Sequence, residues 1–140
     1  MISITRDPID LCKILVDAKD RSAGGTVLFI GSVRDHNEKG TVSEIYYEAY
    51  KEMAEDKMAE IESEVRKRWK VKKFIAIHRI GDLKVGDVSV AVAVSTEHRK
   101  EAFEACKYGI DEIKTRVPIW KKEVSESGVA WVEGISPKSD

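Results

Sequence analysis

The sequence lacks any apolar run close to the ~20 residues that a membrane-spanning helix requires. It also lacks a strong charge of either sign, because 24 Lys and Arg residues nearly balance 25 Asp and Glu residues and leave a net charge of −1. We therefore do not expect a protein that binds nucleic acid over its whole surface, and any anion site must be a local cluster of basic residues. The first ten residues, MISITRDPID, show no basic stretch followed by an apolar block, so no secretory signal is visible.

Cysteine and the common catalytic motifs are also scarce. Cys12 and Cys106 lie far apart and form no CxxC motif, which is typical of small apolar residues in a reducing cytoplasm, although a disulfide between them stays open. His36, His78 and His98 lack the spacing of zinc ligands, so we expect no metal. Because GxGxxG, P-loop and GxSxG motifs are absent, nothing supports a nucleotide-phosphate cradle or a serine nucleophile. We expect a cytoplasmic protein without a cofactor.

The 140 residues are 42% hydrophobic and 35% charged, which is typical of one globular domain, and we expect residues 1–140 to form a single domain. Apolar spacing and chain breakers predict helices and strands in mixed order. The predicted helices are one capped at Asp7-Pro8 that runs to about Ala18, Lys51–Trp69, and one capped by Thr96 that runs to about Arg116. The predicted strands are Thr26–Val33, Val42–Tyr47, Phe74–Ile80, Val88–Ser95 and a hairpin after Pro118. This order favours an α+β domain with a mostly antiparallel sheet and an added β hairpin.

Two finer expectations concern burial. The first strand, with the sequence TVLFIGSV, is expected to be largely buried. The last helix is expected to bury a stripe that consists of Ala102, Phe103, Cys106, Ile110 and Ile113. Residues 34–40 are predicted to form a polar loop, residues 81–87 a turn region, and residues 136–140 a frayed tail.

Basic side chains stand where these elements begin and end. Arg34 follows a predicted strand and opens a loop, where a scaffold can present a side chain to a ligand. His98 and Arg99 lie in the first turn of the last helix, where the helix dipole favours anions over cations. Their charge is locally out of place there, which indicates an anionic ligand. For each of these residues, a solvated surface position is the alternative.

Two lysines flank Pro118. Lys114 lies in the last helical turn, where a cation suits the dipole without any further role. Lys121 follows in a predicted strand; if it lies over the apolar side, burial would lower its pKa and favour a nucleophilic amine, and otherwise it is solvated. His98 and Lys114 are 16 residues apart on one helix, which is roughly 24 Å. One copy of the chain therefore has two separate sites, or two copies share a composite pocket in a symmetric dimer.

Five runs carry a resemblance to a known family. They are FIGSVRDHNEKG (29–40), YYEAYKEMA (46–54), HRIGDLKVGD (78–87), VSTEHRKEAFEAC (94–106) and DEIKTRVPIWKKE (111–123). With these runs in order over most of its length, the sequence resembles the large, catalytic subunit of molybdopterin synthase, the MoaE family. Each run alone would be a weak indication, and the five in register make the resemblance specific.

The resemblance implies a sulfurtransferase of molybdenum cofactor biosynthesis. Such an enzyme moves sulfur from the C-terminal thiocarboxylate of a small ubiquitin-like sulfur-carrier subunit, of the MoaD type, to cyclic pyranopterin monophosphate (precursor Z). The product is the dithiolene of molybdopterin. The resemblance also implies an α/β hammerhead fold with an added antiparallel β part, and a homodimer of large subunits within a heterotetramer.

Matched residue by residue, the resemblance implies six site residues. The catalytic lysines would be Lys114 and Lys121, and the substrate-binding residues would be Phe29, Arg34, His98 and Arg99, with the last two lent by the adjacent subunit. Two alternatives remain. One is a non-catalytic module that holds an acidic peptide tail, and the other is a single-stranded RNA binder, which would need exposed aromatic residues interleaved with basic ones.

Overall fold

The computed structural model of the protein describes residues 1–38, 40–125 and 128–132. The predicted tail at 136–140 and the middle of the predicted hairpin turn, 126–127, lie outside the described residues. The helices are α1 (Leu11–Asp17), α2 (Lys51–Arg68) and α3 (Arg99–Arg116). The strands are β1 (Ile2–Thr5), β2 (Gly25–Ser32), β3 (His36–Asn37), β4 (Gly40–Ala49), β5 (Val71–Arg79), β6 (Gly81–Lys84), β7 (Val88–Thr96), β8 (Ile119–Ser125) and β9 (Gly128–Val132).

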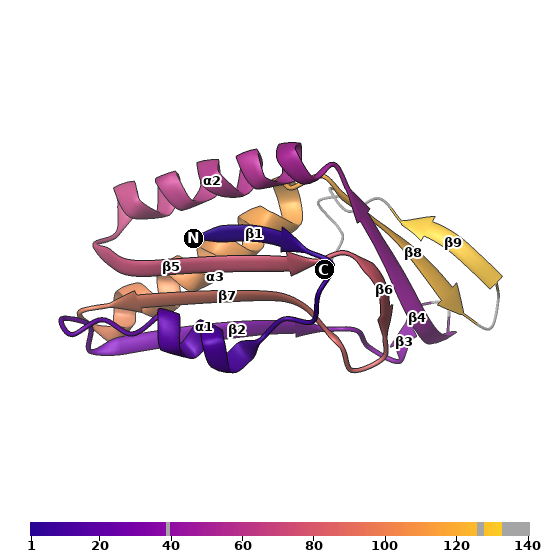
Figure 1. Cartoon of the computed structure of the whole chain (residues 1–140), viewed down its shortest axis with the longest axis horizontal. Coiled ribbons are helices and arrows are strands. Elements are labelled where there is room, and N and C mark those ends of the chain that lie inside the picture. Colours follow the sequence, from indigo (N-terminus) through magenta and orange to yellow (C-terminus); the bar gives the residue numbers. More distant parts are fainter. Residues whose placement is uncertain (39, 126–127, 133–140) are drawn as a thin grey trace.

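The strands form two sheets, which lie beside each other in Figure 1. The first sheet has the order β1-β5-β7-β2, and only its β1–β5 pair is parallel. The second sheet has the order β3-β4-β8-β9, with β6 also paired to β4, and all its pairs are antiparallel. The predicted α+β class, the mostly antiparallel pairing and the β8–β9 hairpin are therefore confirmed.

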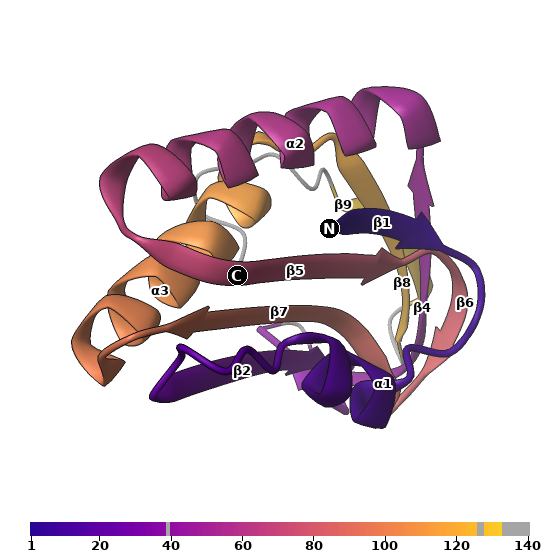
Figure 2. The ribbon, with the colours of Figure 1, turned by 60° about the vertical axis from the view of Figure 1, so that its left-hand side comes forward.

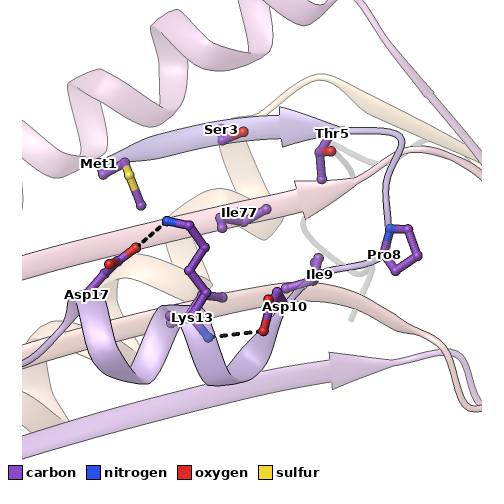
Figure 3. A pocket seen from close by; sticks show the side chains of 10 residues that line it. Met1, Ser3, Thr5, Pro8, Ile9, Asp10, Lys13, Asp17 and Ile77 are labelled. Carbon is purple, nitrogen blue, oxygen red and sulfur yellow. Dashed lines mark hydrogen bonds and ion pairs between the residues drawn. The ribbon is translucent and has the colours of Figure 1, made fainter.

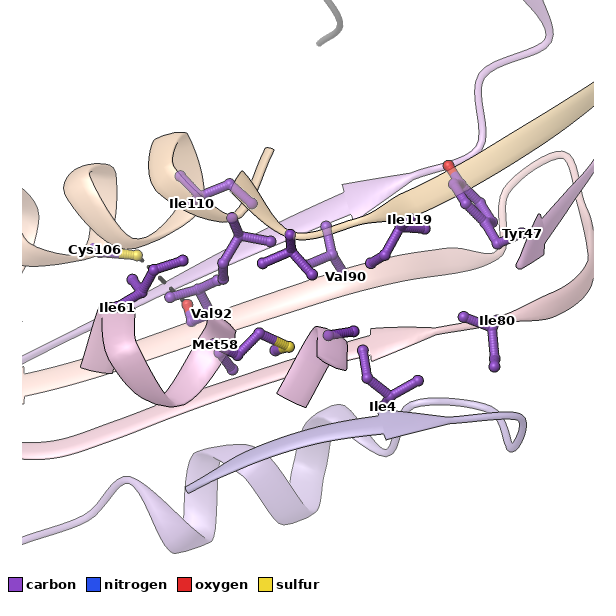
Figure 4. Packing of buried hydrophobic residues seen from close by; sticks show 14 of the residues in the cluster. Ile4, Tyr47, Met58, Ile61, Ile80, Val90, Val92, Cys106, Ile110 and Ile119 are labelled. Atoms are coloured by element: carbon purple, nitrogen blue, oxygen red, sulfur yellow. Dashed lines mark hydrogen bonds between the residues drawn. The ribbon is translucent and has the colours of Figure 1, made fainter. Parts of the chain in front are cut away.

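Helices cover both faces of the first sheet (Figure 2). On one face, α2 and α3 pack over the sheet, and this layer contains the largest buried apolar side chains, among them Phe74 of β5 and Met58 and Ile61 of α2. Figure 4 shows residues of both helices meeting Val90 and Val92 of β7. On the other face, the short helix α1 covers a smaller cluster, which consists of Ile14, Ala18, Ile75, Ala91 and Ala93.

Local sequence explains where two of the helices lie. In α2, the residues Ala54, Met58, Ile61 and Val65 are spaced by four, three and four positions, and all four are fully buried, as predicted. For α1 the predicted cap at Asp7 is wrong. Asp10 caps this helix instead, because its Oδ1 accepts the backbone N–H of Lys13 at 3.0 Å.

Two predictions about burial are also wrong. The strand β2 is not largely buried, because it is an edge strand; Phe29 and Ile30 are 38% and 40% exposed. Phe103 does not belong to the buried stripe of α3, since its side chain is 61% exposed. Helical spacing alone does not distinguish the centre of a buried face from its border. Both errors concern β2 and α3, two elements that are neighbours in the fold.

Three short strands and one helix start were not predicted. The strand β3 lies in the segment predicted as a loop, β6 lies in the predicted turn region, and β1 has only four residues. Thr96 is not the cap of α3; its hydroxyl donates to the carbonyl of His98, and His98 itself is the N-cap residue. These strands exist because a longer strand pairs with each of them, which local sequence does not reveal.

Candidate functional site

The strand β8, which lies between β4 and β9, places Lys121 in the second sheet. Lys121 lies opposite Tyr47 of β4 in the strand register. Its Nζ is 3.8 Å from Oε1 of Glu123, and the two side chains are only 20% and 11% exposed. The other carboxylate oxygen of Glu123 accepts a hydrogen bond from Asn37 at 2.8 Å. Lys121 is therefore a partly buried cation that forms an ion pair with a hydrogen-bonded carboxylate.

Alternation along β8 sends the neighbouring side chains of Trp120 and Lys122 to the opposite face. The Nζ of Lys122 lies 5.7 Å from the ring centroid of Trp131, which is a cation–π contact. The ring of Trp120 lies edge-on to Tyr50, with 6.4 Å between centroids. Of the two adjacent lysines, Lys121 is thus the one that shares a face with Tyr47.

Lys114 lies in the last turn of α3, and its charge acts on His78 of β5. His78 is 5% exposed, and its Nδ1 donates to the carbonyl of Arg79 at 2.8 Å. Its ring lies edge-on to Tyr47, with centroids 5.1 Å apart. Burial, and then the charge of Lys114, lower the pKa of His78 to about 4, so the ring is neutral near pH 7. The charge of Lys114 therefore acts on one member of a buried Tyr47–His78 pair, and Lys121 lies opposite the other member in the strand register.

Our reading of the sequence treated His78 only as a possible metal ligand. The available signal was its place near the end of a predicted strand, among apolar neighbours. Tyr47 belongs to the same group: burial raises the pKa of its hydroxyl, which is hydrogen-bonded to Ser89. Both residues line the junction between the two sheets.

The other predicted residues lie along β2 and at the far end of α3. Phe29 is on the exposed edge strand, and Arg34 is exposed two residues after that strand ends. His98 and Arg99 lie at the N-terminus of α3, which at 18 residues is about 27 Å long. One copy of the chain therefore keeps His98 and Arg99 at the opposite end of α3 from Lys114.

A hollow of about 220 Å³ lies elsewhere, between β1 and α1 (Figure 3). It is lined by residues such as Ile9, Ile14 and Ile77, and the ion pair of Lys13 with Asp17 stands at its side. None of the six predicted site residues lines it. Within the part of the chain that the structure describes, no cluster of His, Cys, Asp and Glu has the makings of a metal site, and no helix is long and apolar enough to cross a membrane.

Comparison with known proteins decides the family. The sequence model of the MoaE protein family matches residues 4–116. The chain belongs to the MoaE family. It is 42% identical over 135 residues to a molybdopterin synthase catalytic subunit of Pyrococcus abyssi, which covers 95% of this chain and 91% of the relative.

Solved MoaE-type structures share the fold. The X-ray structure of molybdopterin synthase from Staphylococcus aureus superposes with a TM-score of 0.88 at 38% identity, over 93% of this chain and 95% of that one. A complex of subunits 1 and 2 of the molybdopterin-converting factor from Helicobacter pylori gives a TM-score of 0.77, over 94% of this chain and 89% of that one. At 19% identity this second likeness concerns the fold alone.

Proposed function

We propose that this MoaE-family chain is the catalytic subunit of a molybdopterin synthase. It transfers sulfur from the C-terminal thiocarboxylate of a small ubiquitin-like partner of the MoaD type to cyclic pyranopterin monophosphate, and so forms the molybdopterin dithiolene. The observation that carries the proposal is that Lys121 lies opposite Tyr47 and the charge of Lys114 acts on His78, the two members of one buried pair, in a chain whose relatives bear this name. The H. pylori structure, as a complex of two subunits, is consistent with a partner protein.

Electrostatics suit this reaction. The donor thiocarboxylate and the cyclic phosphate of the substrate are both anions, and they repel each other in water. Cations fixed in a partly buried site lower the cost of bringing two anions together, because they are oriented before the reactants arrive. In the proposal Lys114 and Lys121 face the thiocarboxylate and the reacting pterin carbons and assist proton transfer. Phe29, Arg34, His98 and Arg99 hold the pterin and its phosphate.

The chemical step balances with water as the only further reactant. The thiocarboxylate sulfur forms a bond to a substrate carbon while a carbon–oxygen bond of that same carbon breaks, and the oxygen either stays on the phosphate or leaves as water. The substrate is then linked to the partner's terminal glycine through an acyl–sulfur bond. Water then cleaves that bond, so the partner leaves with an ordinary carboxylate and the sulfur stays on the substrate. One dithiolene needs two sulfurs and therefore consumes two partner molecules.

A pair of neighbouring lysines tests the chemistry. Lys121→Ala removes the buried amine and is expected to abolish sulfur transfer from a thiocarboxylated partner. Lys122→Ala is the matched control, because that lysine lies one residue away on the opposite face, over Trp131, and should keep the activity. Dithiolene formation is measured directly. Full activity of Lys121→Ala would remove this lysine from the mechanism. If the unaltered protein binds the partner's C-terminal tail but forms no dithiolene, the chain is a binding module and not the enzyme.

The proposal includes a homodimer that completes the site. In the described residues β2 pairs with β7 on one side only, and the surface around its other edge exposes Phe29, Ile30 and Phe103. Antiparallel pairing of two β2 edges about a two-fold axis would bring the start of one β2 to the end of the other. The start of β2 lies against Arg99, because a Cβ added at Gly25 would be 3.0 Å from the Arg99 Cα. The end of β2 leads to Arg34, so this pairing would join the two halves of the site.

Subunit mixing tests the shared site. Lys121→Ala and Arg99→Ala are each expected to be inactive alone. If the site is shared, co-expression of both variants restores about a quarter of the sites, because half of the dimers are mixed and one of the two pockets in each mixed dimer is intact. No recovery, with mixed dimers verified by mass, would mean that each copy works alone. The proposal further places the enzyme in the cytoplasm, where the free thiols of Cys12 and Cys106 are stable.

A further inference from the structure

Glu123 of β8 is a nearly buried carboxylate whose two oxygens contact different side chains. The Glu123 side chain is only 11% exposed, and the residue opposite it in β4 is the buried Ile45. A carboxylate in such surroundings needs hydrogen-bond donors from the protein, because water reaches it poorly. Its Oε2 accepts a hydrogen bond from the Asn37 side chain at 2.8 Å, whereas its Oε1 lies 3.8 Å from Nζ of Lys121. Since 3.8 Å is longer than a hydrogen bond, Asn37 is the partner that fixes the carboxylate.

Asn37 reaches Glu123 from a short strand that backbone bonds hold in place. The strand β3 is only two residues long, and Asn37 pairs with Gly40 at the start of β4. Gly40 has a φ of 130°, a conformation that favours glycine and lets the chain turn between β3 and β4. The backbone N–H of Val42 also donates to the Asp35 carbonyl at 2.8 Å. The Asn37 amide is therefore carried by a segment that is itself tied to the second sheet.

The Asn37–Glu123 hydrogen bond joins two parts of the proposed site. Arg34 lies three residues before Asn37 in the chain, and Lys121 lies two residues before Glu123, on the same face of β8. At 3.8 Å the carboxylate attracts the Lys121 ammonium without holding it in a direct hydrogen bond to Oε1, so its N–H groups can turn to an anionic reactant. A neutral amide suits the other oxygen, because it fixes the carboxylate without adding a cation that would compete with Lys121.

We propose that Asn37 is a positioning residue for the sulfur transfer: its amide holds Oε2 of Glu123, and the carboxylate so fixed sets the direction in which the Lys121 ammonium faces the thiocarboxylate. The inference rests on the proposed function above. Asn37 acts through Glu123 and Lys121 and not on a reactant. Without the amide, the Glu123 carboxylate turns and closes on Lys121 in a direct, charge-assisted hydrogen bond, which takes N–H donors away from the reactants.

Replacement of the amide tests the hydrogen bond. Asn37→Leu keeps nearly the shape of the side chain and removes the donor, and Asn37→Ala removes the donor without adding apolar bulk. For both variants, the single-turnover rate at saturating pterin should fall about 10-fold, the order expected for a hydrogen bond to a charged group, while KM for the pterin changes little. His36→Leu is the matched control, because that side chain lies one residue away and is 68% exposed, and it should keep the unaltered rate.

Urea unfolding verifies that each variant is folded. Full activity of either folded Asn37 variant would overturn the proposal. A double-mutant cycle then shows whether Asn37 acts through Glu123. In a Glu123→Ala background the acceptor is gone, so the addition of Asn37→Leu should cost little further rate. A second loss of about 10-fold in that background would mean that Asn37 acts by another route, and would also refute the proposal.

A further measurement needs no activity. The ¹³Cε resonance of Lys121, assigned by its absence from Lys121→Ala, should move in Asn37→Leu and stay in place in His36→Leu. An unmoved resonance in Asn37→Leu would mean that the amide does not set the position of Lys121, against the proposal. Absence of dithiolene formation by the unaltered protein would contradict the proposed function, and the resonance would still decide whether Asn37 orients Lys121.

Discussion

The buried imidazole of His78 makes the stability of the fold depend on pH in a defined window. Its pKa is about 4 in the folded protein and 6.5 as the ordinary value, so the unfolded chain binds the extra proton first. The contribution of the neutral ring is complete above about pH 6.5 and is lost as the pH falls from there toward 4. Between pH 7 and pH 5 the free energy of unfolding should fall by about 2 kcal/mol through this one residue. His78→Gln removes the titrating group and should flatten the profile by that amount.

Urea unfolding at pH 7, 6 and 5 measures this effect, at one protein concentration because dimer formation would otherwise shift the result. The difference between the two pH profiles is the relevant quantity, since the substitution also changes stability at pH 7. His98→Gln is the matched control, because His98 is highly exposed and its replacement should leave the profile unchanged. Parallel profiles for the unaltered protein and His78→Gln would refute the reasoning, since they would mean that His78 is not held neutral by burial.

Two further predictions concern the packing around the site. Arg116 binds both carboxylate oxygens of Glu64 at 2.9 Å and, with the Tyr108 hydroxyl, lowers the pKa of Glu64 to about 2. Glu64→Gln should lower the free energy of unfolding by about 1 kcal/mol at pH 7, a value discounted because the Glu64 side chain is 36% exposed. In urea unfolding, the difference in stability between the two proteins should shrink below pH 4.5, as Glu64 itself becomes protonated. A difference that stays constant with pH would contradict the ion pair. Gly31→Ala should destabilise the fold by about 1–3 kcal/mol, because the new Cβ would lie 2.6 Å from Cγ1 of Val90. Ser32→Ala, at an exposed position, is the control. Equal unfolding midpoints for the two variants would contradict this steric account.

Much of the fold follows from local pattern. The buried residues of α2 have helical spacing over about three turns, and β7 is a nearly continuous run of small and branched apolar residues, so both elements were predictable. The strands β1, β3 and β6 have two to four residues each, too few for a periodic signal. Phe103 shows that helical spacing also fails to predict burial at the border of a buried face. It lies one residue from the buried Ala102, and only the packing of α3 decides which of the two meets the sheet.

The candidate site, like the fold, was predictable from the sequence only in part. Residue types and their places at element ends were enough to select Arg34, His98, Lys114 and Lys121 as candidates, and the length of α3 was enough to predict that one copy separates His98 from Lys114. The buried, neutral state of His78 could not be predicted from the sequence, because its burial and its contact with Tyr47 arise from strands that are distant along the chain.

The amino-acid sequence by itself determined the family, the α+β class and the spacing of charges along each element, because these depend on residues near one another in the chain. The tertiary structure decided which lysine of the pair at 121 and 122 faces Tyr47, which apolar residues remain exposed on β2 and α3, and why a histidine in the core is neutral. Such properties depend on what lies across a sheet or beneath a helix. Only the folded chain brings those neighbours together.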